Sequence, residues 1–198
     1  SRKFKDSALR RVNFTDMDMR DTTWIDCDLQ AVEFHKCDLT NARFLNVIAQ
    51  QVEFVECKPQ GAVFQENIFS ELHMYGCDGL ISFHSQARSG KIMDCDFERS
   101  CFDYADLSHT YFWDCILDSA SFLKATLDGA SFNNCSITDG EFYAAASLKA
   151  VDFSSAIIYP AQPGPVQPRS QQDWVQISKA PLPSRAAVLI CSDETQLA

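Results

Sequence analysis

The sequence lacks a long apolar segment and an excess of basic charge. None of its apolar runs approaches the roughly 18 residues of a membrane-spanning helix, and its basic N-terminal stretch has no adjoining apolar run typical of a signal peptide. With 27 acidic and 17 basic side chains, its formal net charge is -10, which disfavours a protein that neutralises nucleic-acid phosphates. We therefore expect a soluble protein that contacts neither a membrane nor nucleic acid directly.

Glycine is scarce, at seven of 198 residues, and catalytic signatures are missing. The four histidines are scattered, and no HExxH, GxSxG, P-loop or Cys-x-x-Cys pattern is present. The nine cysteines are an odd number in a chain without a secretion signal, which disfavours a disulfide framework. The sequence predicts no catalytic residue, no cofactor and no metal site, and thus a protein that is not an enzyme.

What the sequence does contain is a period of five. From Ile92 to Phe142, all eleven positions spaced five apart are large and apolar, and a run in another register begins at Phe4. The residue two before each of these central positions is usually small, and the other three are mostly polar. A helix or a simple strand would carry this spacing round to its exposed side. A coil that turns a corner every five residues explains the period.

Segments such as CDLQA (27–31), CDLTN (37–41) and ADLSH (105–109) resemble the A(D/N)LXX repeat of pentapeptide-repeat proteins. The resemblance covers residues 1–158 and implies an all-β fold, a right-handed quadrilateral β-helix of roughly eight coils. It also implies that the central residue and the small residue two before it both point inward. Four repeats in each coil place residues twenty apart in one column and residues ten apart on opposite walls.

This geometry predicts the content of the core. Phenylalanine recurs every ten residues with aliphatic residues between, so two opposite walls should be mainly aromatic and the other two mainly aliphatic. Seven of the nine cysteines occupy the small inward position, and a buried free cysteine behaves as a small apolar residue. We expect two ladders of reduced cysteines, formed by Cys37, Cys57 and Cys77 and by Cys95, Cys115 and Cys135.

Two segments depart from the repeat. The register breaks at residues 79–91, where the pattern allows a loop that bulges from a corner, with His84, Arg88 and Lys91 as candidate interaction residues. Residues 159–198 hold six of the seven prolines and predict an extended linker or tail. That tail either covers the last coil or leads to another domain.

Negative charge is concentrated in the second half of the repeat region. Residues 1–91 carry 11 basic and 13 acidic side chains, net -2, whereas residues 92–158 carry 3 and 11, net -8. The predicted acidic interaction surface consists of Asp94, Asp96, Glu98, Asp114, Asp118 and Asp139. The repeat's own preference for aspartate before the central residue accounts for Asp96 but not for Glu98, Asp118 or Asp139.

The sequence favours a non-catalytic rod that binds a protein partner. Alternating phenylalanine and leucine centres with cysteine in the small position are similar to the quinolone-resistance members of the family. That resemblance implies a DNA-mimicking modulator of a DNA-binding enzyme such as DNA gyrase, acting in the bacterial cytoplasm. The alternative is a protein-recruiting module of a bacterial secreted effector, such as the substrate-binding domain of an effector ubiquitin ligase, acting on a host protein. Both leave the oligomeric state open.

Overall fold

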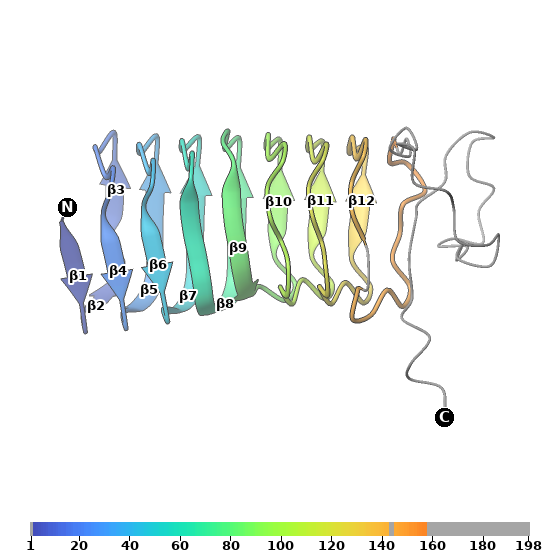
Figure 1. Ribbon diagram of the computed structural model, residues 1–198. Helices are drawn as coiled ribbons and strands as arrows, with labels where there is room; N and C mark the ends of the chain where they lie inside the picture. Colours follow the sequence, from blue (N-terminus) through green and yellow to red (C-terminus); the bar gives the residue numbers. More distant parts are fainter. Residues whose placement is uncertain (1, 143–144, 158–198) are drawn as a thin grey trace, which may run out of the picture.

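The computed structural model describes residues 2–142 and 145–157, and these form one stack of parallel coils without a helix (Figure 1). The stack makes about seven turns, in agreement with the predicted β-helix. Its strands are β1 (Lys3–Lys5), β2 (Ala8–Arg10), β3 (Asn13–Thr15), β4 (Thr23–Ile25), β5 (Asp28–His35), β6 (Arg43–Leu45), β7 (Ile48–Val55), β8 (Ala62–Tyr75), β9 (Ile81–Gln86), β10 (Lys91–Met93), β11 (Tyr111–Trp113) and β12 (Ser131–Asn133).

Each coil has four faces, because the parallel register pairs residues about twenty apart. β1 pairs with β4 so that Phe4 lies beside Trp24, and β5 pairs with β7 so that Phe34 lies beside Phe54. We number the faces by their first central residues: face 1 begins at Phe4, face 2 at Leu9, face 3 at Phe14 and face 4 at Met19.

The core is an aromatic lattice, as the alternation of phenylalanine and leucine predicts. Within one face the rings stack in parallel, for example Phe44 on Phe64 with centroids 4.9 Å apart and planes 2° apart. Between faces 1 and 3 they meet edge to face, as Phe44 and Phe54 do at 5.8 Å and 84°. Both arrangements suit the ring quadrupole, so each coil is held both by its neighbours and across the core.

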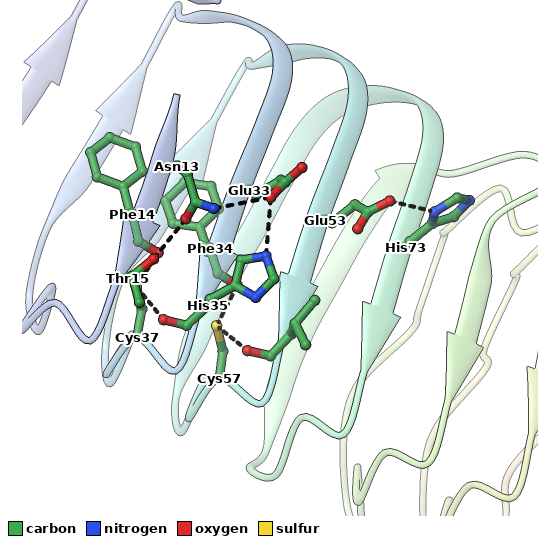
Figure 2. Close-up of polar contacts among 11 residues, drawn as sticks. Asn13, Phe14, Thr15, Glu33, Phe34, His35, Cys37, Glu53, Cys57 and His73 are labelled. Carbon is green, nitrogen blue, oxygen red and sulfur yellow. Dashed lines mark hydrogen bonds and ion pairs between the residues drawn. The ribbon is translucent and has the colours of Figure 1, made fainter. Parts of the chain in front are cut away.

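The cysteines form one ladder where the sequence predicted two. The backbone N–H of Asp96 donates to the carbonyl of Cys77 at 2.9 Å, which places Cys95 directly above Cys77. Each coil from Cys37 to Cys135 therefore contributes a buried cysteine to one column beside face 4, and the eight described cysteines are free. Their thiols donate to main-chain carbonyls, as Cys57 does to Phe34 at 3.2 Å (Figure 2).

Nearly every regular corner contains a residue with positive φ, two positions after the central residue. Twenty-four non-glycine residues adopt this left-handed conformation, and none of them is valine, isoleucine or threonine. A branched Cβ is the side chain that this conformation tolerates least. The polar residues at these positions, many of them aspartate or asparagine, therefore follow from the backbone geometry as well as from solvent exposure.

The prediction of a bulging loop at residues 79–91 is wrong, because most of this segment is part of the regular stack. Residues 81–86 form β9, which pairs with β8 and places Phe83 beside Phe64 in the core of face 1. The pairing of Ala62 with Ile81, and then of Ile68 with Gln86, shows that this coil is shorter than its neighbours by one residue at each of two corners. The register break is a pair of deletions that the solenoid absorbs. The predicted tail, residues 159–198, lies outside the described residues.

Candidate functional site

The predicted acidic residues lie on face 4 of the second half of the rod and on the two corners that bound it, and we call this region the acidic edge. Asp94 and Asp114 occupy equivalent corners of successive coils, because β10 pairs with β11. Asp96 and Glu98 follow on face 4, and Asp139 occupies the next corner. Asp94, Glu98, Asp114 and Asp139 are exposed, whereas Asp96 and Asp118 are half-buried.

Asp118 has a structural role that the sequence did not reveal. One of its carboxylate oxygens accepts hydrogen bonds from Ser136 Oγ and from the backbone N–H of Thr138 in the next coil, both at 2.7 Å. Asp103 and Asp128 bind the next coil in the same way, through a serine hydroxyl and a backbone N–H. We call Asp103, Asp118 and Asp128 the coil staples, and they account for part of the excess acid.

The other acidic residues differ in how far they are neutralised. Asp96 accepts a hydrogen bond from the backbone N–H of Glu98 at 3.1 Å, and Glu98 contacts the guanidinium of Arg99 at 3.2 Å. Asp114 accepts a hydrogen bond from the side-chain amide of Asn134. Arg99 is thus the cation adjoining the acidic surface on face 4, and most of the negative charge remains uncompensated.

Asp78 extends the acidic edge into the first half of the rod. It pairs with Asp96, although 18 residues separate them instead of 20, because of the two deletions. The shortened coil also leaves a shallow open hollow on face 4, lined by Asp78, Leu80, Glu98 and other residues. Sequence analysis missed Asp78 because the stacking partners across the break could not be assigned from the spacing.

The residues of the predicted interaction segment are largely held by other residues. Arg88 makes an ion pair with Asp106 in the next coil, with both guanidinium contacts at 2.6 Å. Burial disfavours the charge of Asp106, but hydrogen bonds from Arg88 and Ser108 outweigh it, so the pKa of Asp106 is lowered. His84 Nδ1 lies 2.7 Å from the carbonyl oxygen of Asp103. Lys91 begins β10 and is exposed on face 3. Their role in binding stays a prediction.

Face 3 carries two further sets of side chains that sequence analysis did not single out. In the first half they are polar pairs: Glu33 contacts both Asn13 and His35, and Glu53 contacts His73, each at 3.1 Å (Figure 2). Further along, the same face becomes apolar and aromatic. The apolar part of the face crosses the register break between Tyr75 and Met93, so this column of outward residues could not be followed from the sequence.

Within the described ranges, 2–142 and 145–157, no group of three or more histidine, cysteine or acidic side chains is arranged to hold a metal ion. Nor do these residues include a helix long and apolar enough to cross a membrane. The alternative function as an effector module depends on the tail, which lies outside these ranges.

The pentapeptide-repeat family model matches residues 7–44 and 93–139, with eight copies of the repeat. No curated protein sequence matches the chain. Among solved structures, a trypsin-treated form of QnrB1, a plasmid-mediated fluoroquinolone resistance protein, is 16% identical over 75% of this chain and 87% of its own, with a TM-score of 0.36.

Two further structures show the same level of likeness. A pentapeptide-repeat protein from the thylakoid lumen of Arabidopsis thaliana is 13% identical over 62% of this chain and 66% of its own, with a TM-score of 0.37. HetL from the cyanobacterium Nostoc, which is involved in heterocyst differentiation regulation, is 15% identical over 79% and 86%, with a TM-score of 0.27. Similarity at this level assigns no function.

Proposed function

This chain belongs to the pentapeptide-repeat family, and from that premise we propose that it is a non-catalytic rod that binds a DNA-binding enzyme by imitating DNA. The enzyme that the sequence resemblance favours is DNA gyrase, which would place the protein in the bacterial cytoplasm. The observation that carries the proposal is the acidic edge formed by Asp94, Asp96, Glu98, Asp114 and Asp139, in which Glu98 alone among these five makes an ion pair within the described residues, with Arg99.

The density of charge along this edge supports mimicry. The coil that contains Asp94, Asp96 and Glu98 advances the rod by about 4.8 Å, so it presents one carboxylate per ~1.6 Å of axis. Duplex DNA carries one phosphate per ~1.7 Å of axis, counting both strands. A protein surface that binds DNA through lysine and arginine would therefore meet carboxylates at a comparable spacing on this coil, with Arg99 offsetting the charge of Glu98.

The test uses gyrase and a charge-reversal variant. We expect the purified chain to inhibit DNA supercoiling by gyrase or to protect gyrase from quinolone-stabilised cleavage. The triple substitution Asp94→Lys, Glu98→Lys and Asp139→Lys should abolish that effect. Lysine is compatible with the left-handed corners of Asp94 and Asp139, because Lys36 and Lys124 already occupy equivalent positions.

The matched control reverses three acidic corners in the first half, Asp6→Lys, Asp26→Lys and Glu66→Lys. It changes the net charge by the same amount on another edge of the rod and should retain the effect. Asp118 is left unchanged in both variants because it joins two coils. The proposal fails if the wild-type chain has no effect on gyrase in molar excess, or if the control loses as much as the acidic-edge variant.

A further inference from the structure

Four coils of face 3 carry a continuous column of outward apolar and aromatic side chains. The parallel pairing places Val55 beside Tyr75, Tyr75 beside Met93, and Met93 beside Trp113. We call Val55, Tyr75, Met93 and Trp113 the face 3 column. Trp113 is 39% exposed, and the other three side chains are half-buried.

A second aromatic side chain supports Trp113. Tyr111 lies two residues earlier on the same strand, β11, and its ring stacks on that of Trp113, with centroids 5.8 Å apart and planes 25° apart. Tyr75 is similarly close to His73, at 5.7 Å. These contacts hold the exposed rings in place, so little side-chain entropy remains to be lost when a partner binds.

The column has polar limits at both ends. Beyond Val55 the next outward residue on the face is His35, which contacts Glu33, and beyond Trp113 it is Asn133. The apolar part therefore spans three steps between coils, or about 14 Å. That length suits a short peptide segment or a single ridge of a partner.

Carboxylates border the column along its whole second half. Asp94 directly follows Met93 and Asp114 directly follows Trp113, and both occupy exposed corners between faces 3 and 4. Lys91 is the cation on these coils of face 3, and it lies on the far side of the face, in line with His73 and Tyr111. The border nearest Trp113 is thus negative.

We propose that the face 3 column and its carboxylate border form a binding surface for arginine side chains of a protein partner. This inference rests on the proposed function, a rod that binds a basic protein, and specifies which chemistry the partner presents. A guanidinium can stack on the indole or phenol ring and at the same time pair with Asp94 or Asp114 through its planar fork. Lysine can make the ion pair but lacks the planar group that stacks.

Arginine selectivity is the property that separates this surface from a merely acidic one. Carboxylates attract both cations and already give arginine some advantage through its planar fork, whereas an aromatic platform adds a preference that is lost when the ring is removed. Aromatic side chains and arginine are also the residues that most often dominate the binding energy of protein interfaces. The surface therefore predicts a preference for arginine over lysine that depends on the ring of Trp113 as well as on the carboxylates.

The probes are fluorescein-labelled deca-arginine and deca-lysine peptides, titrated with the full chain and followed by fluorescence anisotropy at low and physiological salt. We expect deca-arginine to bind about two- to fivefold more tightly than deca-lysine, the size of one exposed cation–π contact. Trp113→Ala should reduce this preference and Trp113→Phe should restore part of it. Asp94→Asn with Asp114→Asn should weaken both peptides together.

Tyr104→Ala is the matched control, because Tyr104 is a more exposed aromatic residue, at 63%, and lies beside Lys124 at the corner between faces 1 and 2. This variant should keep the arginine preference. The proposal is overturned if the wild-type chain binds neither peptide, binds both equally, or keeps its full preference after Trp113→Ala. Circular dichroism and thermal unfolding of each variant establish that it is folded.

Gyrase assays on the same preparations separate the two proposals. A chain that acts on gyrase without preferring arginine would contradict the inference and leave the proposed function standing. A chain that prefers arginine peptides but leaves gyrase unaffected would support the arginine surface and refute the choice of gyrase as the partner.

Discussion

The two halves of the rod share one core but differ in backbone and surface. In the first half the strands run round corners, so that β8 alone spans 14 residues, whereas beyond β10 the coils are joined mainly by isolated bridges and three-residue strands (Figure 1). The first half is nearly balanced in charge, whereas the second half is acidic. The shortened coil with β9 lies between them.

This comparison shows that the same repeat can connect neighbouring coils through two kinds of polar contact. In the first half, outward side chains of successive coils pair with one another, as Asn46 does with Asp26 at 2.7 Å and Lys36 with Glu56 at 3.6 Å. In the second half, the coil staples reach the hydroxyl and backbone of the next coil. Acid in the second half therefore stabilises the fold as well as shaping the surface.

The largest effect should come from the core and should be the same in both halves. Phe34→Ala and Phe112→Ala each remove a fully buried ring that stacks on its neighbour, at 4.9 and 4.7 Å respectively. We expect each to lower the free energy of unfolding by about 3–5 kcal/mol, measured by denaturant titration. Phe14→Ala, in the partly buried end coil, should cost less. Unequal losses for the two buried rings would show that the cores differ.

Substitution at the junction between the halves should destabilise the protein nearly as much. Gly79 has a φ of 145°, and a Cβ there would lie 2.8 Å from the backbone nitrogen of Gln60. We expect Gly79→Ala to lower the free energy of unfolding by about 2–3 kcal/mol, because the clash is with backbone and the conformation excludes a side chain.

Gly76→Ala is the control for Gly79. Its φ is 58°, and an added Cβ would meet only Glu56 Cγ at 3.6 Å, so it should cost about 1 kcal/mol, the strain of one left-handed alanine. Equal effects of the two substitutions would mean that the shortened coil adjusts readily and places no constraint at the junction.

The coil staples should contribute more to the free energy of unfolding than exposed acidic residues of the same half do. Asp118→Ala leaves Ser136 Oγ and the Thr138 N–H without their acceptor and should cost about 1.5–3 kcal/mol. Asp139→Asn, at an exposed corner whose left-handed backbone asparagine adopts readily, should change stability by no more than about 0.5 kcal/mol. Thermal and denaturant unfolding measure both. A result in which Asp139 matters as much as Asp118 would contradict the division between structural and free acid.

The fold could be predicted from the sequence because its period is strict. Each of the apolar centres from Ile92 to Phe142 obeys the spacing of five, and the structure places them in the core. The burial of the free cysteines followed from the small position in the same repeat, although their single column did not. Local spacing determines which residues point inward, so these features need no information about distant contacts.

The surface was harder to predict because it depends on register between coils. A spacing of twenty failed at the shortened coil, so the pairs Asp78 with Asp96 and Tyr75 with Met93 could not be assigned. Asp118 was predicted as free acid because its hydrogen-bond partners, Ser136 and Thr138, are recognisable only once the corners are built. Residues 81–86 resembled a loop because two single-residue deletions interrupt the period of five on which the strand prediction depended.

The smallest expected effect concerns the stability of the second half at acidic pH. The pKa of Asp106 is lowered because hydrogen bonds from Arg88 and Ser108 outweigh its burial, and that of Asp128 is lowered chiefly by the hydroxyl of Ser147. A lowered folded-state pKa contributes stability above the unfolded value of about 3.9, and this stability is lost as the pH falls through the folded pKa.

At pH 6 the Asp106→Asn protein should therefore have a smaller free energy of unfolding than the wild type, and this difference should shrink as the pH falls below about 4. Thermal unfolding between pH 6 and 2 measures this, with exposed Asp94→Asn as the control that should follow the wild-type curve. A difference between Asp106→Asn and the wild type that stays constant down to pH 2 would show that Asp106 stabilises the second half by packing and not by its charge.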